Sequence, residues 1–247
     1  MLGLLGRKLG MAQIFGADGQ AIPVTVLEVG PCTVVQRKSA AGEGYDALQL
    51  GFGSTKPKRM SQPQRGHFTK RGLGLFKHLG EFRTEQAGKF EIGEVLCVAG
   101  FEAGEKVNVR GVSKGRGFQG VIKRWGKHGG PAAHGSDFHR RPGSIGMRTW
   151  PGRIFKNTKL PGHMGCNAVT VRNLKVMEVR PDENILLVKG AIPGPRNGFV
   201  VVTPAAGELE SRANLKRAKA EAEEAKPSAE PGIEETKQEK QAEQTKE

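Results

Sequence analysis

One stretch of this chain, residues 110–163, limits what the whole can fold into. It carries twelve Lys and Arg residues against a single acid, Asp137, and it contains twelve glycines. Its few apolar residues follow neither a helical nor an alternating period. Such a segment has too little apolar surface to offset the entropy of ordering, so it cannot bury a core of its own. The rest of the chain must therefore form a body that holds this basic segment.

The charge of the basic segment, twelve bases less one acid, supplies +11 of the chain's formal +14. A dense run of cations repels itself, and a polyanion that condenses on it relieves the repulsion and releases counterions. Residues 1–207 hold 31 bases and 14 acids, net +17, whereas residues 208–247 hold eight bases and eleven acids, net −3. The body therefore suits a nucleic-acid or anionic-membrane surface, and the basic segment favours nucleic acid.

The cysteines and the hydropathy pattern bear on the compartment. Cys32, Cys97 and Cys166 are odd in number and far apart, which favours small core side chains in a reducing compartment over a disulfide framework. No apolar run approaches the roughly 18 residues of a membrane span, and the chain begins with a strand-like pattern instead of a leader. We expect a cytoplasmic protein with no membrane partner.

Short β-branched or alternating runs recur along the body and predict a mainly β fold, an antiparallel barrel or sandwich. These runs are residues 2–15, 22–29, 34–37, 45–52, 94–98, 106–112, 168–179, 185–188 and 199–202. On this pattern one barrel spans about 1–53, 81–112 and 167–205, and the long loop 113–166 is inserted between two of its strands. A there-and-back path of roughly forty residues could reach at most ~65 Å.

Two other segments differ from the strand pattern. Residues 54–80 are basic, contain no acid and fit neither period, which predicts an excursion with one short helix and a second polyanion-facing surface. Residues 208–247 consist mainly of Ala, Glu, Lys and Gln. Without an apolar stripe to dock, this low-complexity tail is expected to be disordered or a frayed helix.

The run Gly115–Gly120 has the form G-x-G-x-x-G, which is an enzyme-like signal. A dinucleotide-binding unit also needs an apolar second strand that ends in an acid, and residues 126–136 before Asp137 lack strand character. An alternative use of the glycines is to let backbone N–H groups approach phosphate while Lys114 and Arg116 supply charge. A dinucleotide-binding enzyme is kept as a minor alternative.

The histidines of the basic segment suggest a metal site, but no carboxylate cluster or paired spacing supports one, and the surrounding cations would repel a metal. Imidazoles that stack on bases or donate to phosphate account for them better. Trp125 and Trp150 suit base stacking or cation–π contact, with packing at the base of the loop equally open for Trp125. No catalytic constellation is present, so we expect no enzyme, no cofactor and no small-molecule substrate.

Several motifs closely resemble the signature of the ribosomal protein L-three family. They are Gly6-Arg7-Lys8-Leu9-Gly10-Met11, Ser113-Lys114-Gly115-Arg116-Gly117-Phe118-Gln119-Gly120, Lys123-Arg124, Gly130-Pro131, His134-Gly135-Ser136, His139-Arg140, Arg141-Pro142-Gly143-Ser144-Ile145-Gly146, Pro151-Gly152-Arg153, Pro161-Gly162-His163-Met164-Gly165 and Leu186-Leu187-Val188-Lys189-Gly190-Ala191-Ile192-Pro193-Gly194-Pro195. The match runs in order over residues 1 to about 205. The resemblance does not extend to the tail.

This resemblance implies a structural constituent of the large ribosomal subunit with a closed, translation-factor-like β-barrel. Such a protein binds large-subunit (23S-type) rRNA near its 3′ end, nucleates early subunit assembly and contacts neighbouring ribosomal proteins. Its basic loop extends toward the peptidyl transferase centre. Many bacterial relatives carry a methylated glutamine where this chain has Thr149, so that modification is expected to be absent.

Charge, aromatic character and the resemblance together define the expected rRNA-binding residues. They are Arg7, Lys8, Lys56, Lys58, Arg59, Lys70, Arg71, Lys114, Arg116, Lys123, Arg124, Lys127, His128, His134, His139, Arg140, Arg141, Arg148, Trp150, Arg153, Lys156, Lys159 and His163. A free-standing nucleic-acid-binding protein or RNA chaperone would use the same residues. It would bind duplex DNA as well as rRNA, which separates it from the ribosomal hypothesis.

Overall fold

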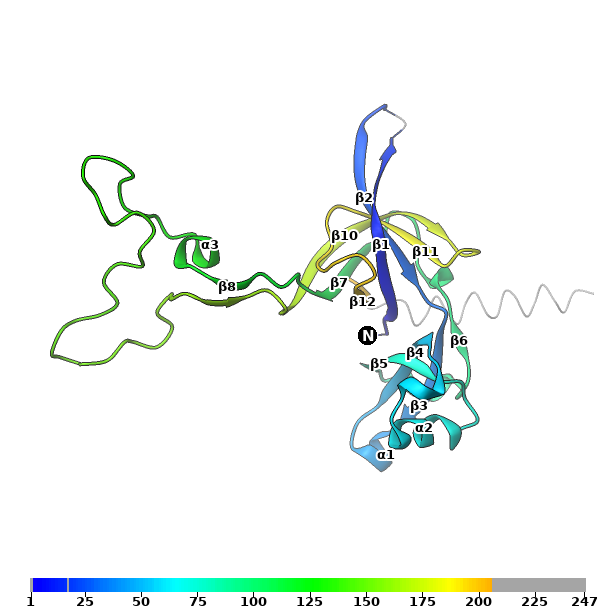
Figure 1. Cartoon of the computed structure of the whole chain (residues 1–247). Helices are drawn as coiled ribbons and strands as arrows, with labels where there is room; N and C mark the ends of the chain where they lie inside the picture. Colours follow the sequence, from blue (N-terminus) through cyan, green and yellow to red (C-terminus); the bar gives the residue numbers. More distant parts are fainter. Residues whose placement is uncertain (1, 17, 206–247) are drawn as a thin grey trace, which may run out of the picture. The chain divides into compact units, whose positions relative to one another are not determined.

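The computed structural model describes residues 2–16 and 18–205, and within them the chain is mainly β (Figure 1). Six antiparallel strands close into a barrel in the order β1-β12-β7-β10-β11-β2. They are β1 (Leu4–Phe15), β2 (Ala21–Val29), β7 (Lys106–Val112), β10 (Ala168–Arg180), β11 (Ile185–Lys189) and β12 (Phe199–Pro204). The predicted mainly β fold is confirmed, and a closed barrel is present, although it contains fewer of the predicted strands than expected.

The barrel closes because its strands alternate buried and exposed side chains, and the buried set fills the interior. In β7, Val107 and Val109 are fully buried, and in β12 Val200 and Val202 are buried as well, with Val202 paired to Val109. Each such side chain stabilises the fold by about 1.5–3 kcal/mol. Gly6 is required where β1 meets β2, since a Cβ there would collide with the carbonyl oxygen of Glu28. The barrel is thus specified by the chain's own packing.

A second sheet has the order β5-β4-β3-β6. Its strands are β3 (Cys32–Lys38), β4 (Ala47–Ser54), β5 (Phe76–Arg83) and β6 (Val95–Leu96). The assignment of residues 30–53 and 81–100 to the barrel is therefore corrected, because their strands pair with one another instead. Alternation predicts that a strand forms, but the choice of partner depends on contacts far along the chain.

Short helices connect the strands: α1 (Ala40–Glu43), η1 (Pro57–Arg59), α2 (Gln62–Thr69), η2 (Ala87–Lys89) and η3 (Val98–Gly100). Helix α2 is the short helix predicted for residues 54–80, anchored by buried Phe68 edge-on to Phe76 at 5.8 Å. That excursion ends earlier than predicted, since β5 already begins at Phe76. The run at 94–98 is only the two-residue β6 followed by η3. Within the described residues, no helix is long and apolar enough to cross a bilayer.

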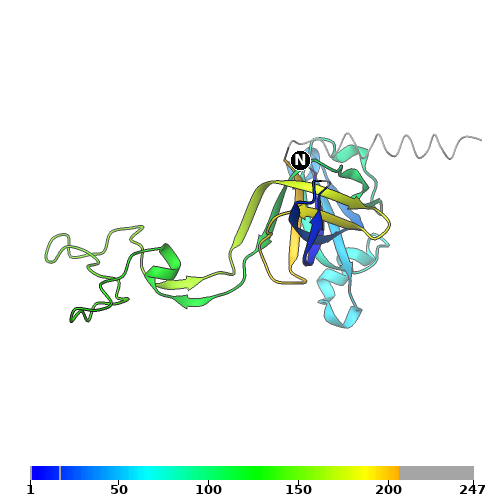
Figure 2. The ribbon, with the colours of Figure 1, turned by 90° about the horizontal axis from the view of Figure 1, so that it is seen from above.

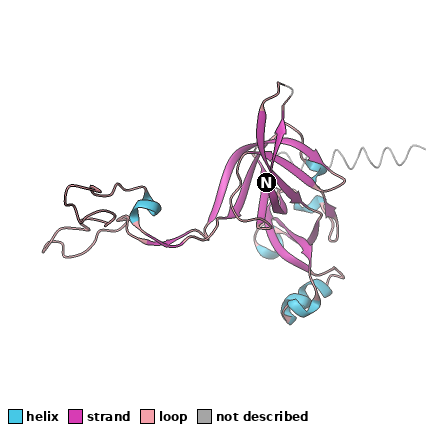
Figure 3. Ribbon diagram, turned by 45° about the horizontal axis from the view of Figure 1, so that its top comes forward, coloured by secondary structure: helices cyan, strands magenta, loops and turns pink. Residues whose placement is uncertain are grey.

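The segment inserted between β7 and β10, residues 113–166, is called the arm below. It contains a two-stranded ribbon of β8 (Gly117–Gln119) and β9 (Gly162–Met164) and the helix α3 (Val121–Trp125). Figure 2 follows it out through β8 and α3 and back through β9. In Figure 3 the stretch beyond α3 is drawn almost wholly as loop. The predicted insertion of one long loop between two barrel strands is confirmed. The predicted disordered tail, residues 208–247, lies outside the described residues.

Candidate nucleic-acid interface

The root of the arm is a built structure in which the outgoing and returning chains pair. The Ser113 N–H donates to the Asn167 carbonyl at 2.9 Å, and the Arg116 N–H donates to the Met164 carbonyl at 2.9 Å. Gly165 has a φ of +87°, and a Cβ there would collide with the carbonyl of Lys114. The glycines of the two motifs therefore let the chains approach closely, which extends the β7–β10 pairing into the ribbon β8–β9.

Helix α3 is fastened to the returning chain at a single carbonyl. The indole N–H of Trp125 and Nη1 of Arg124 each donate to the Leu160 oxygen at 2.9 Å. The Arg124 guanidinium also lies 5.0 Å from the centroid of the Trp125 ring. Trp125 thus packs at the base of the loop, which is one of the two roles predicted for it. Its side chain remains 44% exposed, so a face is still available for stacking.

Beyond α3 the arm contains almost no internal structure. Residues 126–163 are all described, and none of them is buried. Three backbone hydrogen bonds link residues within 127–159, namely Gly130 N–H to His139, Arg141 N–H to Phe138 and Thr158 N–H to Phe155. Large apolar side chains are left in solvent, among them Trp150 at 85% and Met147 at 68% exposed. Together, exposed apolar groups and unpaired backbone indicate a surface made for a partner.

Two comparisons with known proteins bear on this geometry. The family model for ribosomal protein L3 matches residues 69–184, a range that includes the whole arm. A curated relative, the large ribosomal subunit protein uL3 of Geobacter sulfurreducens, is 52% identical over 200 residues, which is 81% of this chain and 95% of the relative. The chain belongs to the ribosomal protein L3 family. The resemblance inferred from the motifs is thereby confirmed.

Most residues expected to bind rRNA in this L3-family protein are solvent-exposed. The exposed ones are Arg7, Lys56, Lys58, Arg59, Lys70, Lys114, Arg116, Lys123, His128, His134, His139, Arg140, Arg141, Arg148, Trp150, Arg153, Lys156, Lys159 and His163. Arg71, Arg124 and Lys127 are half-buried. The arm brings the residues from Lys114 to His163 onto one segment. Lys58 and Arg59 lie on η1, Lys56 directly precedes it, and Lys70 and Arg71 follow α2. Arg7 and Lys8 lie on β1, apart from both of these sets.

Lys8 differs from the rest of the set, because its side chain is only 9% exposed. Its ammonium group donates to the Ile192 carbonyl at 2.7 Å. Burial, and secondarily the charge of Lys114, lower the pKa of Lys8. Lys8 therefore braces the body near the root of the arm, and this differs from the surface position expected of an RNA ligand. Arg7 is also engaged, through its ion pair with Glu28 at 2.7 Å.

The remaining motifs have no enzyme-like setting in the described residues. Every strand pair there is antiparallel, whereas a dinucleotide-binding unit needs parallel strands around its glycine-rich turn. No group of three or more His, Cys, Asp or Glu side chains gathers within residues 2–16 and 18–205. Cys32 is buried as expected, but Cys97 and Cys166 are exposed, which corrects their assignment to the core.

Two kinds of residue on these surfaces were missed by sequence reasoning. The first is the exposed apolar set of the arm, such as Phe118, Met147 and Phe155. An apolar side chain in a segment with no core was the signal that could have identified them. The second is a group that lines a cavity between the barrel and the second sheet, including Lys77 and His78. Its members come from distant segments, so no local pattern connects them.

Proposed function

We propose that this protein is a structural constituent of the large ribosomal subunit that binds large-subunit rRNA through its arm. Residues 1–207 form the ribosomal body in this proposal. The observation that supports it best is the arm itself, a basic and almost wholly exposed segment fastened at both ends to a closed barrel. A segment that cannot order itself gains order from a polyanion, and folded rRNA offers both phosphates and unstacked bases.

The finer parts of the proposal follow the L3-family resemblance. The barrel, of the translation-factor type, binds near the 3′ end of the large-subunit rRNA, and the arm extends toward the peptidyl transferase centre. The protein joins the subunit early in assembly, in the cytoplasm, beside neighbouring ribosomal proteins. Support for a deep location comes from the exposed Trp150 and Met147, since such groups stack on bases or fill gaps where water is excluded.

Sedimentation tests the class of function. A cell lysate is separated on a sucrose gradient, and the protein is detected across the fractions before and after a high-salt wash. We expect cofractionation with large subunits that survives the wash, because an arm threaded through rRNA cannot dissociate by screening alone. A peak at the top of the gradient would contradict the proposal.

Salt dependence tests the chemistry of binding. If about six phosphates are contacted, a plot of log K against log salt for purified large-subunit rRNA should have a slope of around −4 to −5. Duplex DNA of equal length serves as the competitor. Equal affinity for the duplex would instead favour a free-standing nucleic-acid-binding protein.

A further inference from the structure

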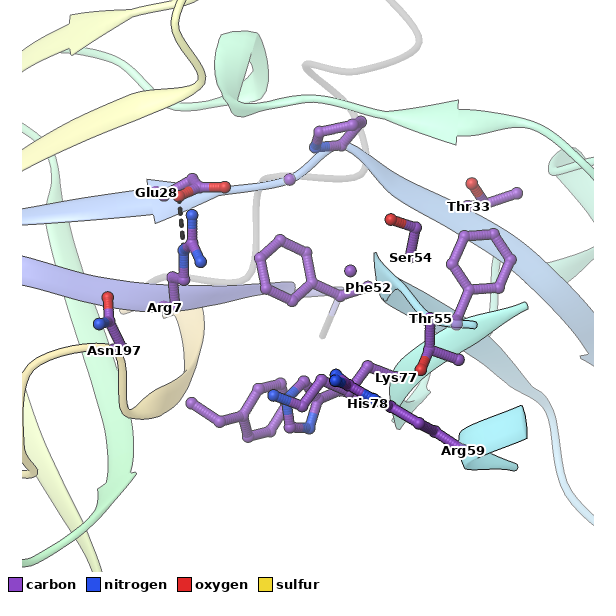
Figure 4. Close-up of a pocket in the computed structure, with 15 residues that line it drawn as sticks. Arg7, Glu28, Thr33, Phe52, Ser54, Thr55, Arg59, Lys77, His78 and Asn197 are labelled. Atoms are coloured by element: carbon purple, nitrogen blue, oxygen red, sulfur yellow. Dashed lines mark hydrogen bonds and ion pairs between the residues drawn. The ribbon is translucent and has the colours of Figure 1, made fainter. Parts of the chain in front are cut away.

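A cavity of about 820 Å³ lies where the barrel meets the second sheet, well apart in sequence from the arm. The barrel supplies Arg7 and Glu28 from β1 and β2 together with Phe199 at the start of β12, and the second sheet supplies residues of β4 and β5. Its volume is in the range of ligand pockets. Figure 4 shows the labelled side chains around this open space.

The charge around the cavity is uneven. Among the described residues, Glu28 is the sole carboxylate that lines it, and Glu28 is already paired with Arg7 at 2.7 Å. Arg59 of η1 and Lys77 of β5, both exposed, also line the cavity. In Figure 4 these two side chains lie together on one side of the open space. With the acid neutralised by Arg7, the cavity offers two cations to an anionic ligand.

Aromatic rings form part of the wall. His78 of β5 stacks on Phe199 of β12 with ring centroids 4.5 Å apart and planes inclined by 20°. Phe52 and Phe76 also line the cavity. Burial, and secondarily the charge of Lys77, lower the pKa of His78 and so favour its neutral imidazole. Flat apolar rings beside two cations are the combination that binds a base and its phosphate in single-stranded nucleic acids.

We propose that this cavity takes one nucleotide of single-stranded RNA, with its base against the aromatic wall and its phosphate at Arg59 and Lys77. Ser54 and Thr55 at the same opening supply hydroxyl groups for the polar edge of the base. This inference rests on the proposed function and names a specific nucleotide site within the body, separate from the arm. A nucleotide held there would fix the barrel and the second sheet on the RNA simultaneously, because both contribute to the walls.

Photo-crosslinking of the full chain can test this assignment. The probe is short single-stranded RNA that contains 4-thiouridine, and crosslinked peptides are identified by mass spectrometry. Crosslinks are expected on peptides that contain residues 52–59 or 76–78, in addition to the arm. Crosslinks in the arm serve as the internal control. If the wild-type protein gave cavity crosslinks but none in the arm, the proposed role of the arm would fail and the cavity assignment would stand.

Two variants separate the cavity from general charge. Ser54→Leu places an aliphatic side chain in the opening and keeps every cation, so it should reduce the cavity crosslinks about tenfold and leave arm crosslinks unchanged, since one stacked base is worth about tenfold or more in affinity. Arg59→Gln with Lys77→Gln changes only exposed side chains and should have a similar effect. The matched control is Lys175→Gln with Lys189→Gln, two exposed cations outside the cavity.

Three results would contradict the assignment of the cavity to RNA. No crosslink at the cavity in the wild-type protein would overturn the proposal, as would equal loss in the control pair and the Arg59, Lys77 pair. Adenosine monophosphate is added as a competitor to distinguish free nucleotide from RNA. If it displaced the RNA from the cavity at equal concentration, the site would be one for a free nucleotide, and the assignment to RNA would be wrong.

Discussion

The barrel and the arm differ in how far their own contacts specify their conformation, and their glycines illustrate part of the difference. In barrel strand β1, a Cβ at Gly6 would collide with the Glu28 carbonyl, so this glycine allows dense packing. In the arm, Gly120 and Gly135 have open space where a Cβ would be. At the root of the arm Gly165 allows a close approach of the two chains, as Gly6 does in the barrel, so the glycines of the arm are of both kinds. The barrel is thus specified by its own packing, whereas the arm has almost no buried side chain that could specify its conformation.

The root of the arm lies between these extremes. The ribbon β8–β9 and the fastening of Trp125 and Arg124 to Leu160 give it internal hydrogen bonds, yet only Val121 is buried between residues 113 and 166. The root fixes where the arm begins. It does not order the loop beyond α3, because none of residues 126–163 is buried.

The largest contrast should be in stability. Leu27→Ala removes a fully buried barrel side chain and should lower the free energy of unfolding by about 2–5 kcal/mol, through lost transfer energy and the cavity left behind. Trp150→Ala removes a larger side chain that is 85% exposed and should change it by less than about 0.5 kcal/mol. Urea denaturation of both variants measures the difference. Comparable losses would mean that the arm contributes to the folded core.

The arm's cations should control binding without affecting folding. Replacing Lys114, Arg116, Arg140 and Arg141 together with Gln removes four exposed charges. The slope of log K against log salt for large-subunit rRNA should become shallower by about 3, and incorporation into subunits should be impaired. Circular dichroism should show an unchanged barrel. Unfolding of this variant in isolation would refute the separation of arm from body.

A smaller effect is expected at the root. Trp125→Phe removes the indole donor to Leu160 but leaves the Arg124 bond, so a local stabilisation of about 0.5–1.5 kcal/mol should be lost. Amide hydrogen exchange in β8, α3 and β9 should then become several-fold faster, with global stability unchanged. Trp150→Phe is the matched control and should alter nothing. If both substitutions accelerated exchange equally, the hydrogen bond at Leu160 would not be the fastening.

The smallest effect concerns pH at the junction of the barrel and the second sheet. Burial lowers the pKa of His78 in the folded protein, so the unfolded chain binds more protons below about pH 6.5, the ordinary value for histidine. The stabilisation that neutral His78 contributes to the folded protein is therefore complete above that pH and is lost as the pH falls. His78→Phe keeps a ring against Phe199 and should flatten the fall in stability between about pH 7 and 5. An unchanged pH profile would show that His78 titrates alike in both states.

Much of this contrast could be predicted from the sequence, for identifiable reasons. The charge and glycine content of residues 110–163 predict an inserted loop, since neither depends on distant contacts. The alternation of Val107 and Val109 likewise predicts a barrel strand. The second sheet was misassigned because alternation does not identify a strand's partner. Lys8 was expected to be exposed from its charge, whereas its neighbour Ile192, far along the chain, supplies the carbonyl that buries it.

Hydrogen–deuterium exchange of the full chain, free and bound to large-subunit rRNA, tests most directly whether the barrel orders itself and the arm is ordered by RNA. We expect the amides of β2 and β11 to be protected in both states. Amides of residues 126–161 should exchange rapidly in the free protein and become protected on the RNA. Strong protection of these arm amides without RNA, or none with it, would contradict the account.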